Sequence, residues 1–253
     1  MYMWLIIMFF VSLNYANPVQ HGEWDALVKK HVAQDGMVDY AGFVKDKKAL
    51  QHYLDYLSTH QPTAKWSKNE KLAFWINAYN AFTVKLIVDH YPVKSIKDIK
   101  KGIPFVNSVW DIPFIPMGKE KVDLNYIEHS ILRKEFKDPR IHAAINCASF
   151  SCPLLRNEAY TADHLDEQLN DAMRKFINDP QRNQIEKSSV KISKIFSWFS
   201  GDFKLNGASV IDYLNKYSKK SIDYYAKLDY LDYDWELNGI ENKRRQAAKS
   251  FKK

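Results

Sequence analysis

The chain has 253 residues, of which 46% are hydrophobic and 14% aromatic. This composition excludes an intrinsically disordered protein and predicts a packed globule. The net charge is +7, but six basic residues against one acidic residue place +5 of it in residues 241–253. Only +2 remains for the rest of the chain, so we expect a solvated basic tail and no nucleic-acid partner.

The first 16 residues carry no charged side chain, and residues 3–13 are an apolar run. A run of this length is typical of the core of a signal peptide. It falls short of the roughly 20 residues that span a bilayer. We therefore expect a signal peptide over residues 1–16, and an extracytoplasmic (periplasmic or secreted) protein without a stable membrane anchor after cleavage. A buried N-terminal element is the alternative. Residues 17–240 suffice for a single globular domain.

Apolar residues recur at helical spacing in five stretches, residues 24–32, 47–58, 70–91, 122–136 and 161–176. The Pro- and Gly-rich stretch 91–118 predicts loops, a short helical turn and a hairpin, and residues 190–199 predict one or two strands. We expect a turn at residues 200–203. The fold class that follows is α+β, a single helix-rich domain around a small β-sheet.

The helix of residues 70–91 is unusual, because Lys85 is the only charged residue between residues 72 and 88. A helix that is apolar nearly all round is buried. Asn77 and Asn80 lie inside it, and a buried amide without partners costs about 1–3 kcal/mol. Both must therefore be hydrogen-bonded. Either they hold loops by core hydrogen bonds, or one of them faces a cleft.

The helix of residues 122–136 has Asp123 as its predicted N-cap. Glu128 falls within its apolar stripe, which is formed by Leu124, Ile127, Ile131 and Leu132. Burial raises the pKa of a carboxylate, so we expect Glu128 to be buried and hydrogen-bonded, in a functional site or in a structural ion pair. His129 points in a different direction and fits an ordinary exposed histidine.

The stretch HAAINCASFSCP, residues 142–153, holds the only two cysteines of the chain. Residues 140–148 have the pattern of a strand buried on both faces. Alternation along this strand places His142 and Asn146 on one face and Cys147 on the other. The polar residues that follow predict a turn that carries Cys152.

Three interpretations of the two thiols stay open. A Cys147–Cys152 disulfide would close the turn after the strand. Alternatively, Cys152 is a nucleophile with His142 as its base and Asn146, Glu128 or Asp202 to orient the base. A papain-like arrangement fits this option, since papain-like folds place their histidine on a strand. In the third interpretation both cysteines are buried small hydrophobic residues.

Other chemistry has less support in the sequence. Four residues separate the two cysteines and the histidines are scattered, so we expect no metal site. The chain has no GxSxG, HExxH, P-loop or GxGxxG motif, and we expect no cofactor. Glu128 and Asp202 are a long-range carboxylate pair that leaves glycoside hydrolysis as a minor alternative.

Six stretches in chain order resemble the family called domain of unknown function 547. They are VDYAGF, FWINAYNAFTV, LNYIEHSILR, DPRIHAAINCASFSCPLL, FSWFSGDF and YDWELN, within residues 38–238. The resemblance implies an α+β domain, often exported from bacteria, and it brings no activity. Its recurring polar positions correspond here to Asn77, Asn80, Glu128, His129, His142, Asn146, Cys152 and Asp202.

Two functions follow as hypotheses. The first is an exported thiol-dependent hydrolase or acyltransferase that acts on amide or peptide bonds. The second is a noncatalytic binding module with a structural Cys147–Cys152 disulfide and an aromatic-lined cleft for a small-molecule or peptide ligand. Candidate cleft walls are Trp75, Tyr79, Trp110, Trp198 and Trp235.

Overall fold

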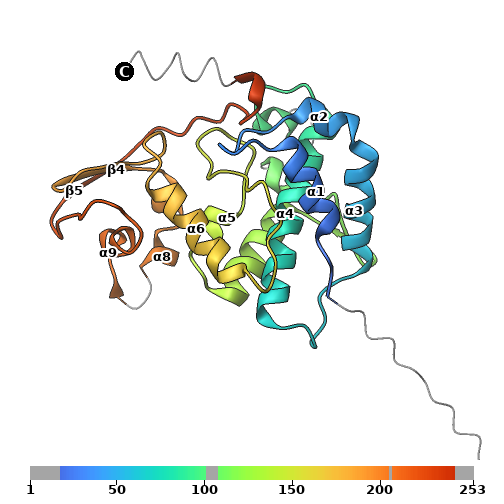
Figure 1. Ribbon diagram of the computed structural model, residues 1–253, viewed down its shortest axis with the longest axis horizontal. Helices are drawn as coiled ribbons and strands as arrows, with labels where there is room; N and C mark the ends of the chain where they lie inside the picture. Colours follow the sequence, from blue (N-terminus) through green and yellow to red (C-terminus); the bar gives the residue numbers. More distant parts are fainter. Residues whose placement is uncertain (1–17, 101–107, 205–206, 243–253) are drawn as a thin grey trace, which may run out of the picture.

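The computed structural model describes residues 18–100, 108–204 and 207–242. The predicted signal peptide and residues 243–253 of the basic tail lie outside the described residues. Helices and two small sheets make up the molecule (Figure 1), so the α+β class is confirmed. Within the described ranges, no helix has both the length and the apolar character needed to cross a membrane.

The N-terminal half is built around one buried helix, α4 (Lys68–His90). Three shorter helices pack around it, α1 (Gly22–His31), α2 (Tyr40–Lys45) and α3 (Lys47–Thr59). A capping box starts α4, because the Ser67 hydroxyl accepts from the backbone N–H of Glu70 and the Glu70 carboxylate accepts from that of Ser67. Its side chains are buried on nearly all sides, as the apolar run predicts.

The predicted hairpin is present in the connection that follows α4. This connection contains the short 3₁₀ helices η1 (Ile96–Lys100) and η2 (Val109–Asp111), then β1 (Ile115–Met117) paired antiparallel with β2 (Glu120–Val122). The wide helix η3 (Tyr126–Phe136) comes next, packs against α4 and has π-helical backbone bonding. Asp123 accepts a hydrogen bond from the Tyr126 N–H at 2.7 Å, as expected of the cap.

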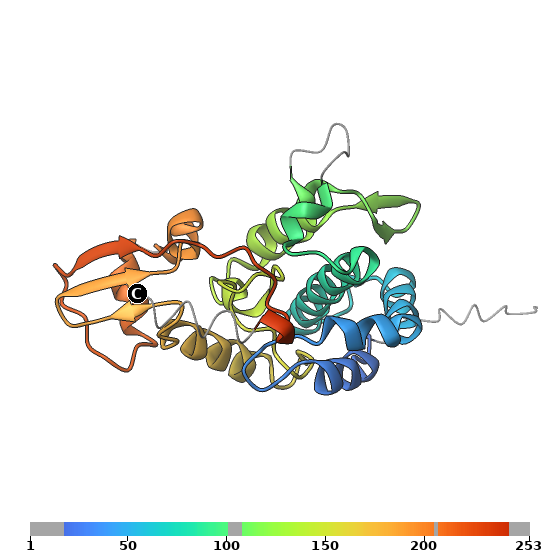
Figure 2. The same ribbon diagram turned by 90° about the horizontal axis from the view of Figure 1, so that it is seen from above.

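The C-terminal half forms a second apolar core at the other end of the molecule (Figure 2). Its sheet has the order β3-β4-β5, with β3 antiparallel to β4 and β4 parallel to β5. The strands are β3 (Gln184–Ile185), β4 (Ser189–Ile192) and β5 (Lys227–Tyr230), and the helices are α6 (Leu165–Ile177), α7 (Ile195–Trp198), α8 (Ser200–Phe203) and α9 (Val210–Asn215). The chain then returns to the first core and ends its described part in η5 (Ile240–Asn242).

The strand predicted over residues 140–148 is wrong. Residues 141–144 form one turn of helix, α5 (Ile141–Ala144), whose first N–H groups bond to carbonyls of the preceding turn. Ile141 and Ala144 belong to the first core and Ala143 to the second. Short apolar runs have the same pattern in a buried strand and in a helix that touches two cores. Residues 195–203 likewise form α7 and α8 instead of a strand and a turn.

Two asparagines of α4 each bind both backbone groups of a distant segment. The Asn77 side chain donates to the Tyr160 carbonyl at 2.7 Å and accepts from the Tyr160 N–H at 3.0 Å. The Asn80 side chain donates to the Ala144 carbonyl at 2.9 Å and accepts from the Asn146 N–H at 2.8 Å. The interpretation that buried amides hold loops is confirmed for both.

We expect Asn77→Ala and Asn80→Ala each to lower the free energy of unfolding by about 1–3 kcal/mol, because each leaves a buried N–H and a buried carbonyl without partners. Urea denaturation measures the effect. Asn69→Ala is the control, since Asn69 is exposed on the same helix and its replacement should change stability by less than about 0.5 kcal/mol. An unchanged stability for the buried pair would contradict the prediction.

Candidate functional site

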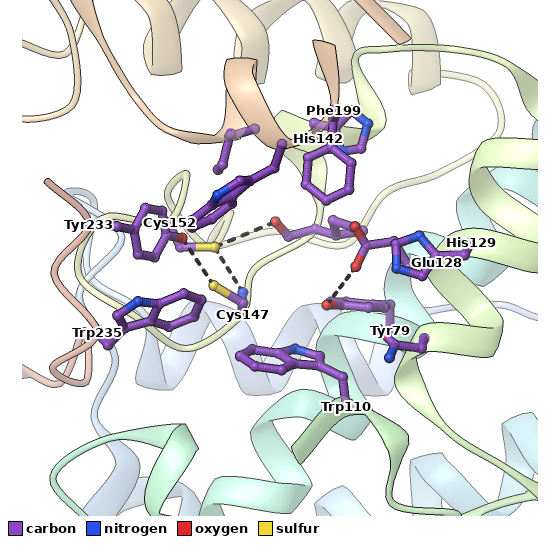
Figure 3. Close-up of a pocket in the computed structure, with 14 residues that line it drawn as sticks. Tyr79, Trp110, Glu128, His129, His142, Cys147, Cys152, Phe199, Tyr233 and Trp235 are labelled. Atoms are coloured by element: carbon purple, nitrogen blue, oxygen red, sulfur yellow. Dashed lines mark hydrogen bonds between the residues drawn. The ribbon is translucent and has the colours of Figure 1, made fainter. Parts of the chain in front are cut away.

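A pocket lies where the two cores meet (Figure 3). The first core supplies Tyr79 from α4, Trp110 from η2, and Glu128 and His129 from η3. The second half supplies Trp198 and Phe199 from the α7–α8 region, and Tyr233 and Trp235 from the segment after β5. His142, Cys147 and Cys152 complete the lining. The pocket is therefore assembled from segments far apart in the sequence.

Aromatic rings form one wall of this pocket. Trp235 stacks on Trp198 with centroids 5.8 Å apart, and it meets Trp110 edge-on at 5.5 Å and Tyr233 at 4.5 Å. Trp198 is 48% exposed, so this wall reaches the surface. Four of the five aromatic candidates from the sequence line the pocket, whereas Trp75 packs in the first core.

The loop that follows α5 is fixed by hydrogen bonds from the Asn146 side chain, which accepts from the Ala148 N–H at 2.8 Å and donates to the Pro153 carbonyl at 2.7 Å. Ala148 has a left-handed φ of 59° and is fully buried. Such a conformation costs about 1–3 kcal/mol for a residue with a β-carbon, and it concentrates at functional sites. Asn146 thus shapes the loop, and it does not line the pocket.

A buried arginine holds the far end of the same loop. The Arg182 guanidinium donates to the carbonyls of Cys152, at 2.6 Å, and Phe150, at 2.7 Å. The C-terminal segment also binds this loop through two backbone hydrogen bonds. The N–H groups of Phe150 and Ser151 donate to the carbonyls of Glu236 and Asp234. The loop that carries both cysteines is thereby bound on three sides.

Of the two thiols, the pKa of Cys147 is lowered and that of Cys152 is raised. The Cys147 side chain lines the pocket, and its sulfur lies 3.1 Å from the Ser149 hydroxyl and 3.3 Å from the Tyr233 hydroxyl. Burial raises the pKa of this thiol, but hydrogen bonds from the Cys152 thiol, from Ser149 and from Tyr233 outweigh burial and bring the pKa to about 7. A thiolate stabilised in this way is a nucleophile at neutral pH.

Cys152 is buried, and its environment differs from the one predicted for a nucleophile. Its sulfur accepts from the Cys147 backbone N–H at 2.9 Å and lies 4.0 Å from the Ile145 carbonyl. Burial and the neighbouring Cys147 raise the pKa of this thiol well above its usual range. In the described part of the chain, none of its hydrogen bonds involves a histidine. Both cysteines are free thiols, so the predicted disulfide is not formed in this structure.

Glu128 is buried and hydrogen-bonded, as predicted. It is 7% exposed, and its carboxyl group accepts from the Tyr79 hydroxyl at 3.2 Å. Burial raises the pKa of this carboxyl to about 7, against the smaller lowering effect of the Tyr79 hydrogen bond, and the charge of Cys147 raises it further. Glu128 therefore exchanges its proton near neutral pH, within the electrostatic reach of the thiol.

His142 lines the pocket but is engaged with Asp202. Its Nε2 lies 2.7 Å from an Asp202 carboxylate oxygen, and its ring stacks on Phe199 with centroids 4.1 Å apart. Burial lowers the pKa of this histidine, against the raising effect of Asp202. A neutral ring that donates to Asp202 through Nε2 keeps Nδ1 as an acceptor.

Asp202 lies behind His142 and outside the pocket lining. Arg133 clamps its carboxylate with two hydrogen bonds of 2.6 and 3.0 Å. Burial raises the pKa of Asp202, but the bonds from His142 and Arg133 outweigh burial and hold that pKa far below its usual range. A carboxylate so fully paired is poorly suited to form the catalytic pair of a glycosidase with Glu128.

His129 lies at the pocket rim beside Glu128, although adjacent residues of an α-helix diverge. The π-helical bonding of η3 gives a wider turn than an α-helix, and such segments are frequent at functional sites. Arg133 donates to His129 Nδ1 at 3.0 Å, which orients the ring. Asn77 and Asn80, the other candidate cleft residues, do not line the pocket. Among the residues that the structure describes, no group of three or more His, Cys, Asp and Glu is arranged to hold a metal ion.

Among the contributors to the site that were not assigned as such from the sequence are Cys147 as a pocket thiol, Tyr233 as its hydrogen-bond partner, and Arg133 as the partner of Asp202. The last two lie in the stretches YDWELN and LNYIEHSILR, so the resemblance marked their neighbourhood. Cys147 was placed inside a strand, and the error in backbone conformation concealed its access to the pocket.

Residues 63–177 match the family model described as "Protein of unknown function, DUF547". The match includes Glu128, His142 and both cysteines. No curated protein and no solved structure matches the chain.

We expect Glu128→Gln to remove a pH dependence of stability. The folded pKa of Glu128, about 7, exceeds its ordinary value of 4.5. The neutral carboxyl therefore stabilises the fold fully below pH 4.5, and this contribution of about 3 kcal/mol is lost as the pH rises through 7. Relative to Glu128→Gln, the wild type should lose stability by that amount in urea denaturation between acidic and alkaline pH. A constant difference between the two proteins would contradict the assignment.

We expect iodoacetamide to alkylate Cys147 with a midpoint near pH 7, since the hydrogen bonds at its sulfur lower the thiol pKa, whereas an ordinary thiol has a pKa of about 8.5. Mass spectrometry of the peptide identifies the modified residue. Cys152→Ser is the matched control, because its hydroxyl still accepts the Cys147 N–H. Faster labelling of Cys152 than of Cys147 in the native protein would overturn the assignment.

Proposed function

We propose a function from the pocket, because the family model that residues 63–177 match is defined without an activity. The proposed function is a thiol-dependent hydrolase or acyltransferase that acts on amide or peptide bonds. Cys147 replaces Cys152 as the proposed nucleophile. The observation that carries the proposal is a stabilised thiol in a pocket that also contains a carboxyl group with a matched pKa of about 7.

Acylation would begin at the Cys147 sulfur. The thiolate attacks the carbonyl carbon of the substrate, a C–S bond forms, and negative charge develops on the carbonyl oxygen. The amine then leaves as the C–N bond breaks, and it takes a proton from the neutral Glu128 carboxyl. A general acid works best when its pKa lies near the operating pH, which the pKa of Glu128 satisfies.

Deacylation reverses the role of Glu128. The carboxylate now accepts a proton from a water molecule, or from an acceptor amine, that attacks the thioester carbon and releases Cys147. Water gives a hydrolase and an amine gives an acyltransferase. When the sulfur is acylated, the Ser149 and Tyr233 hydroxyls lose the thiolate as a hydrogen-bond partner, and in this proposal they can donate to the substrate oxygen instead.

His142 and Asp202 serve as positioning residues in this proposal. The Asp202 carboxylate holds the His142 ring, and Phe199 stacks on that ring to form a pocket wall. The sequence hypothesis also has a carboxylate that orients His142. The role proposed here for His142 differs from that of a base for Cys152, because the Cys152 thiol is hydrogen-bonded to the Cys147 N–H and the Ile145 carbonyl.

The aromatic wall favours a second candidate, a noncatalytic module that binds a small molecule or peptide. Trp198, Trp235 and Trp110 offer stacking surface beside the thiol. Export is part of both candidates and rests on the apolar start of the chain. The binding module needs no reactive Cys147, so a chemical test separates the two.

p-Nitrophenyl acetate, a small activated ester, tests the acyl-transfer proposal. We expect a burst of nitrophenolate and an acetyl group on the Cys147 peptide by mass spectrometry. Cys147→Ser should lose both signals, and Cys152→Ser should keep them. Glu128→Gln should acylate but release the acetyl group at least tenfold more slowly, since general base catalysis contributes about 10²–10⁴-fold. Acetylation of surface lysines only, with Cys147 unmodified, would contradict the acyl-transfer proposal and favour the binding module.

A further inference from the structure

The two thiols of the pocket loop differ in access although they lie together. Both cysteines line the pocket, but the Cys147 side chain is partly exposed, whereas Cys152 is 4% exposed. The Cys152 sulfur is 2.9 Å from the backbone nitrogen of Cys147 (Figure 3). An oxidant that enters the pocket therefore reaches the more exposed Cys147 more readily, and Cys152 lies beside it.

We infer that Cys147 and Cys152 form a peroxide-oxidisable pair, in which Cys147 reacts with a hydroperoxide and Cys152 resolves the product as a disulfide. The structure is the reduced state of this pair, because both thiols are free. The disulfide considered from the sequence is thus a product of oxidation rather than a permanent link. The inference uses the same thiol as the proposed acyl transfer, but it does not depend on that activity.

The first step reduces the hydroperoxide. The Cys147 thiolate attacks the terminal peroxide oxygen, so that an S–O bond forms and the O–O bond breaks. The departing alkoxide or hydroxide takes a proton from the Glu128 carboxyl and leaves as alcohol or water. Cys147 loses two electrons and becomes a sulfenic acid. The hydroxyl groups of Ser149 and Tyr233 hold the sulfur in place for this attack.

The second step forms the disulfide. The Cys152 sulfur attacks the sulfur of the sulfenic acid, an S–S bond forms, and the S–O bond breaks. The hydroxide that leaves takes the Cys152 proton, and the product is water. A small-molecule thiol then restores both cysteines by exchange.

The loop geometry favours this second step over further oxidation. Asn146 fixes the start of the loop by its bonds to Ala148 and Pro153, and Arg182 fixes the end. The backbone of Cys147 already contacts the Cys152 sulfur. The second step then requires the two sulfurs to approach to the roughly 2.05 Å of a disulfide, starting from side chains that already lie in one loop.

Hydrogen peroxide on the full chain tests the inference, with Cys152→Ser as the matched variant. Wild type should lose the mass of two hydrogens on the peptide that contains both cysteines, and iodoacetamide should then label neither. Dithiothreitol should restore both thiols. Cys152→Ser should give a sulfenic acid that dimedone traps and that proceeds to sulfinic acid. Cys147→Ser should remain unoxidised at Cys152.

Accumulation of sulfinic acid in wild type at the rate seen in Cys152→Ser would overturn the inference, and so would a Cys147 inert to peroxide. The acyl-transfer proposal is judged separately, by acetylation of the reduced wild type. A protein that forms the reversible disulfide but is never acetylated refutes only the proposed function. A protein that is acetylated and overoxidised without a disulfide refutes only this inference.

Discussion

The site depends on one turn of α4. Asn80 holds the backbone at Ala144 and Asn146, where α5 ends and the cysteine loop begins, and Tyr79 beside it holds the Glu128 carboxyl. Asn77, three residues earlier, binds Tyr160 in the same two-bond manner. Because α4 is buried on nearly all sides and contacts both groups, a single element connects the start of the thiol loop with the carboxyl group. Polar residues inside an apolar helix are costly, and here they fix geometry rather than add binding surface.

Burial raises the pKa of both Glu128 and Cys147, and the hydrogen-bond donors around each group determine how far that effect is offset. Glu128 receives a hydrogen bond from the single hydroxyl of Tyr79, so burial prevails and its pKa rises to about 7. Cys147 receives hydrogen bonds from Cys152, Ser149 and Tyr233, so its pKa falls below the ordinary value of a thiol, to about 7. The charge of each also opposes the ionisation of the other. The number of donors around a buried group, rather than its depth, therefore decides its protonation at neutral pH.

Helices long enough to show several turns of hydrophobic periodicity could be predicted from the sequence, whereas the conformation of shorter segments could not. The approximate extent of α4 and the burial of Glu128 both follow from patterns that span several helical turns. Residues 141–144 are too few to separate a helical turn from a strand, and that ambiguity concealed the access of Cys147 to the pocket. The contact between Cys147 and Tyr233 joins residues 86 positions apart, and nothing in local pattern predicts which distant hydroxyl approaches a thiol. The α+β class could be predicted, but the pairing of its segments could not.

The return of the chain after β5 has a consequence for the order in which the molecule is completed. Tyr233 reaches Cys147, and the segment up to Asn238 binds the cysteine loop, Lys94 and Val38. A ribosome adds about 5–20 residues per second, so the 86 positions between the two residues correspond to roughly ten seconds of synthesis at intermediate speed. During that interval the residues of α4 and Cys147 have been synthesised, but Tyr233, one of the donors that lower the thiol pKa, has not. The nascent chain therefore lacks this donor until the segment after β5 has been translated.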